Sequence, residues 1–309
     1  MFIGVDIGGT KCAVIRGTAE GTVLEKRRFA TTTPEETQQA IIAAAKELAA
    51  GQPIRGVGVS CGGPLDEETG VILSPPNLPG WDAVPMAKML SDALGVPCAV
   101  RNDANACALA EWRFGAGRGT RNMIFLTFGT GLGAGLILNG ALYGGTNGQA
   151  GEVGHIRLAA DGPVGYGKAG SFEGFCSGGG LAQLGERLAQ DYIARGETPA
   201  FWQEGKPADA ATLASFARAG DPCAREVFDL CGTRLGEGLS LLVDILNPER
   251  IVIGSIFARC TDLLTAPMEA VLRREALPLS RQVCRIVPAE LSEQVGDVAA
   301  LAVAAETVR

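Results

Sequence analysis

The stretch MIFLTFGTGLGAGLILNG, residues 123–140, decides how the rest of the chain is interpreted. It begins as an apolar run rich in β-formers, turns at Gly129-Thr130-Gly131, and ends as a second apolar run. Residues 2–16 repeat this pattern, with two apolar runs around Gly8-Gly9-Thr10. Small, hydroxyl-bearing turns expose backbone N–H groups and admit an anion closely. The two hairpins therefore predict a duplicated fold that holds a phosphate between its halves.

The composition is that of a folded protein large enough for more than one core. A length of 309 residues predicts roughly two domains. Hydrophobic residues make up 47% and charged residues 20% of the chain, an ordinary globular balance. The formal net charge of -7 argues against a nucleic-acid partner bound through phosphate neutralisation. It does not argue against a small anionic ligand held locally by backbone dipoles.

The cysteines and the apolar stretches predict a soluble, cytoplasmic protein without a membrane partner. Nine cysteines are scattered without a CxxC pair, which indicates buried, reduced thiols. No basic segment followed by an apolar one precedes the first predicted strand at Phe2. The longest apolar stretch, residues 123–138, is interrupted by four glycines. It is also shorter than the about 20 residues that a membrane-spanning helix needs.

Predicted strands alternate with predicted helices, which is typical of an α/β fold. Residues 1–118 have the order β-β-β-α-β-α-β-α, and the pattern restarts at Asn122. A C-terminal amphipathic helix is expected to pack back on the first part of the chain. The predicted domains are an N-terminal lobe over 1–118 with the helix at about 296–309, and a C-terminal lobe over 119–295 with a Gly-rich insertion at about 144–180.

The motif DIGGTK, residues 6–11, has two interpretations. It can be a tight hairpin whose glycines serve turn geometry alone. It can also be a phosphate loop, with Asp6 placed to orient magnesium or its bound water. The similar sequence TFGTG at residues 127–131 favours the phosphate loop. Lys11 can add positive charge at the phosphates or point to solvent, and the sequence does not decide between them.

The motif RNDAN, residues 101–105, follows a predicted strand and opens a predicted helix. Asn and Asp are good N-caps, so helix capping is the simpler interpretation. The functional interpretation is a carboxylate general base, Asp103, with Asn102 beside it as a hydroxyl-binding amide. The carboxyl ends of strands are where α/β sheets bind ligands. Two adjacent candidates, where one cap would suffice, favour a functional role.

His155, the only histidine of the chain, lies in the motif GEVGH at residues 151–155. A lone histidine is more often structural than catalytic. This one shares a Gly-rich segment with Glu152, and Glu173 follows. Such a set of carboxylates and an imidazole suits a polyhydroxylated ligand. A metal site is the rival, although no cysteine lies nearby with ligand spacing.

Two further glycine motifs carry weaker signals. The GxGxxG match at residues 165–170 follows a loop and has no βαβ unit around it, so a dinucleotide site there is not expected. Residues 251–255, IVIGS, form a predicted buried strand that ends at Gly254. This end permits the close approach of a flat ring, but a plain strand-to-helix turn explains it equally well.

Taken together, these motifs resemble those of the ROK family (repressors, open reading frames and sugar kinases) in the actin/hexokinase/Hsp70 superfamily. The motifs that carry the resemblance are DIGGTK at 6–11, GVSCGGPLD at 58–66, NLPGW at 77–81, NDANA at 102–106, FGTGLGAGLILNG at 128–140 and GEVGH at 151–155. The resemblance implies a two-lobed, duplicated ribonuclease-H-like fold of the actin/hexokinase type, with a cleft between the lobes. It also implies ATP- and magnesium-dependent phosphorylation of a hexose 6-hydroxyl, most like a glucokinase, and a homodimer.

The resemblance further implies roles for particular residues. Asp103 resembles the general base that deprotonates the sugar 6-hydroxyl. The implied sugar ligands are Asn77, Asn102, Glu152, His155 and Glu173, with the backbone of Gly62 and Gly63 nearby. The implied nucleotide and phosphate residues are Gly8, Gly9, Thr10, Thr130 and Gly131 in the two loops, Asp6 and Lys11 beside the first loop, and Gly254 at the adenosine.

The chain departs from the family pattern in two places. The family's zinc site combines a histidine with a CxCGxxGC cluster, but the aligned residues 164–171 read VGYGKAGS. The cysteine positions are occupied by Val164, Tyr166 and Ser171. We therefore predict no structural zinc and keep His155 as a sugar ligand. The family's Gly-Gly-Gly after the late strand is Gly254-Ser255-Ile256 here, which leaves the phosphoryl donor open.

Two kinds of alternative function remain. Kinases for fructose, N-acylhexosamines or allose share the same motifs, and the sequence does not separate them. A sugar-sensing regulator without catalysis is the alternative from another class. The family's repressors carry an N-terminal winged helix, for which this chain is expected to have no room.

Overall fold

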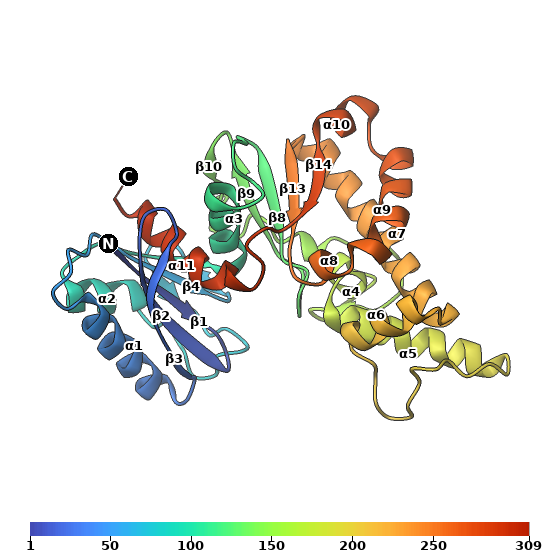
Figure 1. Ribbon diagram of the computed structural model, residues 1–309, viewed down its shortest axis with the longest axis horizontal. Coiled ribbons are helices and arrows are strands. Elements are labelled where there is room, and N and C mark those ends of the chain that lie inside the picture. Colours follow the sequence, from blue (N-terminus) through green and yellow to red (C-terminus); the bar gives the residue numbers. More distant parts are fainter. Residues whose placement is uncertain (309) are drawn as a thin grey trace. The chain divides into compact units, whose positions relative to one another are not determined.

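The structure of the protein is a computed structural model that describes residues 1–308 (Figure 1). Contacts between residues divide the chain into two compact units. Unit 1 comprises Met1–Thr120, Gly135–Ala150 and Glu290–Arg309, and unit 2 comprises Arg121–Ala134 and Gly151–Ala289. The two units are described separately. The domain boundaries at residues 118 and 295 stay predictions.

Unit 1 is built on a five-stranded mixed sheet of order β3-β2-β1-β4-β7. Its strands are β1 (Phe2–Ile7), β2 (Lys11–Gly17), β3 (Val23–Ala30), β4 (Val57–Cys61) and β7 (Cys98–Asn102). β1 is antiparallel to β2 and parallel to β4, and β7 continues parallel to β4 at the edge. The carboxyl ends of β1, β4 and β7 therefore meet at one edge of this sheet.

Unit 1 also contains helices and a short hairpin. They are α1 (Pro34–Ala49), β5 (Leu65–Asp66), β6 (Val71–Ile72), α2 (Met86–Leu94), α3 (Asp103–Phe114), the 3-10 turn η2 (Ser292–Gln294) and α11 (Val295–Glu306). Local signals set the ends of several of these helices. α1 begins at Thr33, whose side chain accepts a hydrogen bond from the main-chain N of Glu36, with Pro34 in the first turn. α2 ends at Gly95 in the left-handed conformation.

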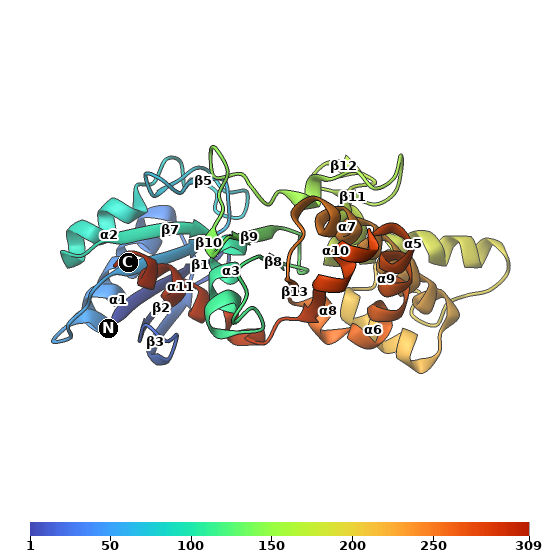
Figure 2. The ribbon, with the colours of Figure 1, turned by 90° about the horizontal axis from the view of Figure 1, so that it is seen from above.

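The two faces of the first sheet have different packing partners. Ile3, Val5 and the other residues of the larger core pack with α1 and α2. On the opposite face α11 covers β1 and β4, and both ribbon views show α11 (red) beside the blue strands (Figures 1 and 2). Glycines on this face make room for α11, since a Cβ at Gly58 would lie 2.1 Å from the main-chain N of Ala304.

A second five-stranded sheet repeats the strand order of the first. Its order is β10-β9-β8-β13-β14, which is again third, second, first, fourth and fifth along the chain. Its strands are β8 (Met123–Leu126), β9 (Ala134–Leu138), β10 (Ala141–Leu142), β13 (Arg250–Ile253) and β14 (Arg285–Pro288). β13 runs parallel to both β8 and β14, as β4 does to β1 and β7. The fold is thus a duplicated mixed α/β fold, as the two turn motifs predict.

By the bounds of the two units, β8, β13 and β14 belong to unit 2, whereas β10 and nearly all of β9 belong to unit 1. The other elements of unit 2 are mostly helical. They are η1 (Val153–His155), β11 (Val164–Gly165), β12 (Lys168–Ala169), α4 (Phe172–Phe175), α5 (Gly178–Ala194), α6 (Ala210–Ala219), α7 (Pro222–Leu246), α8 (Ile256–Arg259), α9 (Thr261–Glu275) and α10 (Pro278–Val283). α7 and α9 pack closely because α7 carries glycines at the contact. A Cβ at Gly236 would lie 2.7 Å from Cβ of Val271.

Two sequence-based expectations concern the chain as a whole. Within residues 1–308, none of the helices has the length and apolarity needed to cross a membrane. None of the nine cysteines, all within the described residues, forms a disulfide. Cys231 is buried, whereas Cys98 and Cys107 are only partly buried.

Candidate active site

The first glycine turn of unit 1 joins β1 to β2 and is closed by a hydrogen bond from Gly8 N to Lys11 O of 3.1 Å. Its middle residue has no room for a side chain. A Cβ at Gly9 would lie 2.4 Å from the main-chain O of Asn77. The turn and Asn77 are therefore in direct contact, while Thr10 and Lys11 are exposed.

Asp6 lies on β1, at the face of the sheet that α11 covers. Its pKa is raised to about 6, chiefly by burial and to a smaller extent by the charge of Asp297. The other contributing charges are Asp103, which also raises this pKa, and Lys26 and Arg28, which lower it. A largely buried carboxylate among other negative charges is a favourable place for a cation. These surroundings fit the predicted role of Asp6 in orienting magnesium.

The junction between β7 and α3 holds Asn102 and Asp103. Asn102 is the N-cap of α3, and its Oδ1 accepts a hydrogen bond of 3.0 Å from Ala104 N. Asp103 Oδ1 accepts from the same N at 2.8 Å. The Asn102 side chain also faces Gly63, because its Nδ2 lies 3.2 Å from the position of a Cβ on that residue. The Asp103 side chain is exposed, and its charge contributes to the raised pKa of Asp6.

Asn77 brings the predicted sugar ligands of unit 1 next to the first turn. A Cβ on Gly62 would lie 3.5 Å from Asn77 Oδ1. Asn77 also contacts Gly9, through the main-chain O of Asn77. Unit 1 therefore gathers a glycine turn, two amides and a carboxylate in one neighbourhood. These groups can bind sugar hydroxyls and accept a proton beside the glycine turn.

The second glycine turn lies in unit 2, directly after β8. Gly129 N donates to Gly131 O at 3.1 Å, which makes a tight turn. Glu173 lies beside the turn, because a Cβ on Gly131 would be 2.8 Å from Glu173 Oε2. This oxygen accepts a hydrogen bond of 2.9 Å from Leu132 N. One carboxylate oxygen of the predicted sugar ligand Glu173 therefore also holds the second turn in place.

Glu152 precedes the short helix η1 and His155 is its last residue, and both are exposed. η1 packs close to Glu173, since a Cβ on Gly154 would lie 3.3 Å from Glu173 Cβ. The His155 ring meets the edge of the Tyr166 ring, with centroids 5.9 Å apart and an interplanar angle of 72°. Three predicted sugar ligands are thus brought close together in unit 2.

Residues 164–169 form the β11–β12 hairpin with Tyr166 and Gly167 at its tip, both at positive φ. Lys168 Nζ donates to the main-chain O of His155 at 2.6 Å, which ties the hairpin to η1. The GxGxxG match lies in this hairpin rather than between a strand and a helix. Among residues 1–308, no three His, Cys, Asp or Glu side chains are grouped as a metal site.

Unit 2 also contains a pocket with a cavity volume of about 400 Å³. Its lining is formed by Gly129, Thr130, Gly178, Gly179, Asp209, Ala210, Ala211, Ser255, Ile256 and Arg259. The second turn meets the start of α5 here, through a hydrogen bond of 2.7 Å from Gly178 N to Gly129 O. The start of a helix favours an anion, and the pocket has the size of a small-molecule site.

Sequence reasoning found only part of this pocket. Gly254 is not in its lining, and the next residue, Ser255, takes that place. Ser255 has φ 53, which is unusual for a residue with a side chain. Its Oγ accepts a hydrogen bond of 3.2 Å from Arg259 Nη2. The sequence analysis did not identify Asp209 and Arg259 as pocket residues. The helix start at Ser177-Gly178-Gly179 could have been identified, because helix N-termini are typical anion-binding sites.

The sequence profile of the ROK family matches residues 2–307. The chain belongs to the ROK family. This ROK protein is 33% identical over 311 residues to a glucokinase from Streptomyces coelicolor, covering 99% of this chain and 98% of that protein. A xylose repressor from Caldicellulosiruptor bescii is 29% identical over 72% of this chain and 55% of its own length.

A solved structure gives the same result for the fold. It is a ROK glucokinase from Streptomyces griseus in complex with glucose and AMPPNP, with a TM-score of 0.78 and 32% identity, and the match covers 99% of both chains. The predicted family and the predicted duplicated actin/hexokinase-type α/β fold are therefore confirmed. The full-length similarity to glucokinases supports a sugar kinase, while the repressor shows that the family also includes regulators.

Proposed function

We propose that this ROK protein is an ATP-dependent hexose kinase that phosphorylates a sugar 6-hydroxyl, most like a glucokinase. The observation that carries the proposal is the exposed carboxylate of Asp103 at the start of α3. It lies beside Asn102, and its charge acts on Asp6 next to the first glycine turn. The glucokinase relatives support glucose as the first substrate to test.

In the proposed reaction, Asp103 accepts the proton of the 6-hydroxyl as that oxygen attacks the γ-phosphorus of ATP. Asn77 and Asn102 orient the sugar through its other hydroxyls. The turns at residues 8–10 and 129–131 donate backbone N–H groups to the phosphates. Magnesium bound with ATP would neutralise phosphate charge, with Asp6 as the residue that orients it. Catalysis then consists mainly of positioning and electrostatic stabilisation.

We infer that the pocket of unit 2 takes the nucleotide. The second turn and the start of α5 supply N–H groups for phosphates, and Asp209 and Arg259 supply polar groups at its wall. Glu152, His155 and Glu173 are proposed as further sugar ligands. Their support is chemical, because two carboxylates and an imidazole can bind several hydroxyls.

The decisive experiment measures ADP release with ATP and a panel of glucose, fructose, N-acetylmannosamine and allose. We expect kcat/KM to be highest for glucose, by at least about tenfold, because a site built for one set of hydroxyls leaves polar groups unpaired with another. A higher value for another sugar would reassign the substrate and leave the kinase proposal intact.

The second candidate function is a sugar-sensing regulator, which the similarity to a xylose repressor supports. The same panel separates the two classes. A regulator would bind a sugar, measured by calorimetry, and release no ADP with any hexose. The presence of Asp103 favours the kinase.

We also propose a cytoplasmic location and a homodimer. The location is supported by nine cysteines without a disulfide in the described chain, as expected for a reducing compartment. The dimer follows from family resemblance alone. Light scattering of the purified protein would measure its mass directly.

A further inference from the structure

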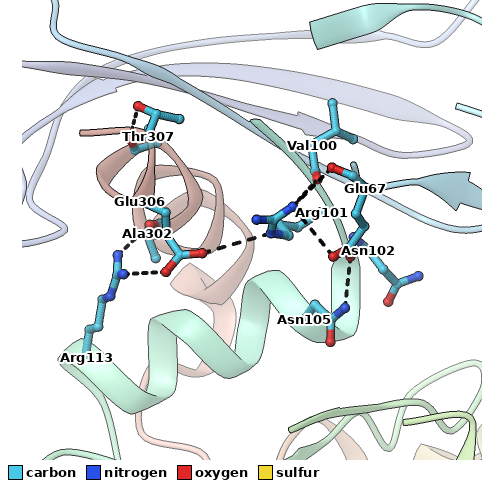
Figure 3. A network of polar contacts seen from close by, with 10 residues as sticks. Glu67, Val100, Arg101, Asn102, Asn105, Arg113, Ala302, Glu306 and Thr307 are labelled. Atoms are coloured by element: carbon cyan, nitrogen blue, oxygen red, sulfur yellow. Dashed lines mark hydrogen bonds and ion pairs between the residues drawn. The ribbon is translucent and has the colours of Figure 1, made fainter. Parts of the chain in front are cut away.

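Glu67 lies between β5 and β6 and reaches the junction where β7 passes into α3 (Figure 3). Its Oε1 accepts a hydrogen bond of 2.8 Å from the main-chain N of Asn102. The same oxygen accepts one of 2.9 Å from Asn105 Nδ2. The Glu67 side chain is only 11% exposed. A largely buried carboxylate thus binds the chain on both sides of Asp103.

These two bonds satisfy groups that the fold leaves without other acceptors. β7 is an edge strand, and the acceptor for Asn102 N is supplied by the Glu67 side chain rather than by a further strand. Asn105 is 2% exposed, and its Nδ2 needs an acceptor inside the protein. A carboxylate accepts both bonds and donates none, so it also fixes the orientation of the Asn105 amide.

Arg101 secures Glu67 from the other side. Its Nη1 lies 3.6 Å from Glu67 Oε2 and donates to the main-chain O of Glu67 at 3.3 Å. Its Nε lies 3.9 Å from Glu306, which also pairs with Arg113 at 2.7 Å. Arg113 Nη1 donates to Ala302 O at 2.6 Å. Glu67 is therefore held by a chain of charges that ends on α11, as Figure 3 shows.

The turn that carries Glu67 does not depend on its side chain. Asp66 shapes this turn, because its Oδ1 accepts hydrogen bonds from Glu68 N at 2.9 Å and Thr69 N at 3.1 Å. The Glu67 carboxylate instead contacts the residue before Asp103 and the residue two positions after it. Its contacts are with the site rather than with its own hairpin.

We propose that Glu67 is a positioning residue that sets the orientation of Asp103 and Asn102 toward the sugar. The inference rests on the proposed kinase function and deepens it. A general base must lie within hydrogen-bond reach of the proton that it accepts, and a small displacement reduces the rate strongly. Without Glu67 the first turn of α3 loses two of its anchors, and both the base and its neighbouring amide move.

The test compares Glu67→Ala, Glu67→Gln and Glu67→Asp with the matched control Glu68→Ala, an exposed neighbour on the same turn. We expect Glu67→Ala and Glu67→Asp to lower kcat by about 10–100-fold and to raise KM for the sugar. KM for ATP should stay unchanged, because the Glu67 carboxylate contacts Arg101, Asn102 and Asn105 rather than the residues proposed to bind the phosphates. Glu67→Gln should retain most activity, since one oxygen accepts both bonds.

Hydrogen exchange gives a readout that does not require turnover. The amide of Asn102 should exchange faster in Glu67→Ala than in the native protein, and at the native rate in Glu67→Gln. If the native protein phosphorylates no hexose, the proposed function fails. Exchange at Asn102 and calorimetric sugar binding then still test the position of Glu67.

Three results would overturn the inference. In the first, Glu67→Ala retains native kcat and sugar KM. In the second, Glu67→Gln loses as much activity as Glu67→Ala, with sugar and ATP KM raised together, which would indicate general damage to the fold. In the third, exchange of the Asn102 amide is unchanged in Glu67→Ala.

Discussion

Asp6 and Asp103 are carboxylates of the same unit with opposite surroundings. Asp6 lies within β1 and faces α11, so burial raises its pKa to about 6. Asp103 is the first residue of α3 and is exposed. The first is suited to a cation and the second to contact with a substrate hydroxyl. This difference fits the two roles that the sequence predicts for them.

Asp103→Asn tests the proposed base. We expect kcat to fall by about 10²–10⁴-fold, the usual contribution of a general base, because an amide cannot accept the proton. Sugar affinity should be kept, since Asn retains an oxygen for Ala104 N. Steady-state kinetics and calorimetry measure the two quantities. The control Asp92→Asn changes an exposed carboxylate that pairs with Lys88, and an equal kcat in both variants would reject the base assignment.

Asp6 also predicts how stability depends on pH. Its folded-state pKa of about 6 lies above the ordinary value of 3.8, so between these values the folded state holds an extra proton. The contribution of Asp6 to stability is therefore present below about pH 4 and is lost as the pH rises through about 6. At pH 7.5 the ionised group destabilises the fold.

Asp6→Asn should remove the destabilisation caused by ionised Asp6 and should also abolish the proposed kinase activity. In magnesium-free buffer at pH 7.5, we expect the free energy of unfolding to rise by on the order of 2–3 kcal/mol. At pH 4 the variant and the native protein should be equally stable. Urea unfolding at the two pH values measures the difference. A gain of equal size at both values would show that ionisation of Asp6 is not its cause.

Among the elements, those with strong local signals were predicted well. The two glycine turns and the β7–α3 junction both follow from short motifs. α9 had no such signal, because Pro267 lies inside it and an internal proline predicts a helix end. In the structure Gly232 of α7 lies against Pro267 of α9, since a Cβ on Gly232 would be only 2.5 Å from the proline ring. Close packing against α7 therefore stabilises α9 despite its internal proline.

The β11–β12 hairpin leads to a prediction about metal content. Val164, Tyr166 and Ser171 occupy the positions of the family's zinc cysteines, and Tyr166 packs against His155 instead. We therefore expect the purified protein to contain about zero zinc per chain. The midpoint of thermal unfolding should not change after treatment with a chelator, because no ligand set is lost. Elemental analysis that finds one zinc per chain, or a lower midpoint after chelation, would contradict this.

At the scale of the whole molecule, each unit is assembled from segments far apart in the sequence. Unit 1 combines the first 120 residues with residues 135–150 and with the C-terminal segment that begins at Glu290. α11 joins it because β1, β2 and β4 present an apolar face with glycines to an alanine-rich helix. Leu301 is fully buried with Phe2 and Ile15. The C-terminal helix is therefore part of the core of unit 1.

Leu301→Ala measures how much this helix contributes. We expect the free energy of unfolding to fall by about 2–5 kcal/mol, because the substitution leaves a cavity against the sheet. The matched control is Leu279→Ala on α10, whose side chain is 78% exposed. It should change stability by less than about 0.5 kcal/mol. Urea unfolding measures both variants, and equal small losses would show that α11 adds little to the core.

The sequence by itself determined the duplicated strand–turn–strand pattern, the family, and the pairing of Asn102 with Asp103 as the candidate for chemistry. Each of these depends on residues within a few positions of one another, so periodicity and turn chemistry reveal them. Only the tertiary structure decided that Glu67 binds the start of α3 and that Asp209 and Arg259 line a pocket with Thr130. These contacts join residues from 35 to more than 100 positions apart. Such pairs are brought together by packing of the whole fold, which no local pattern specifies.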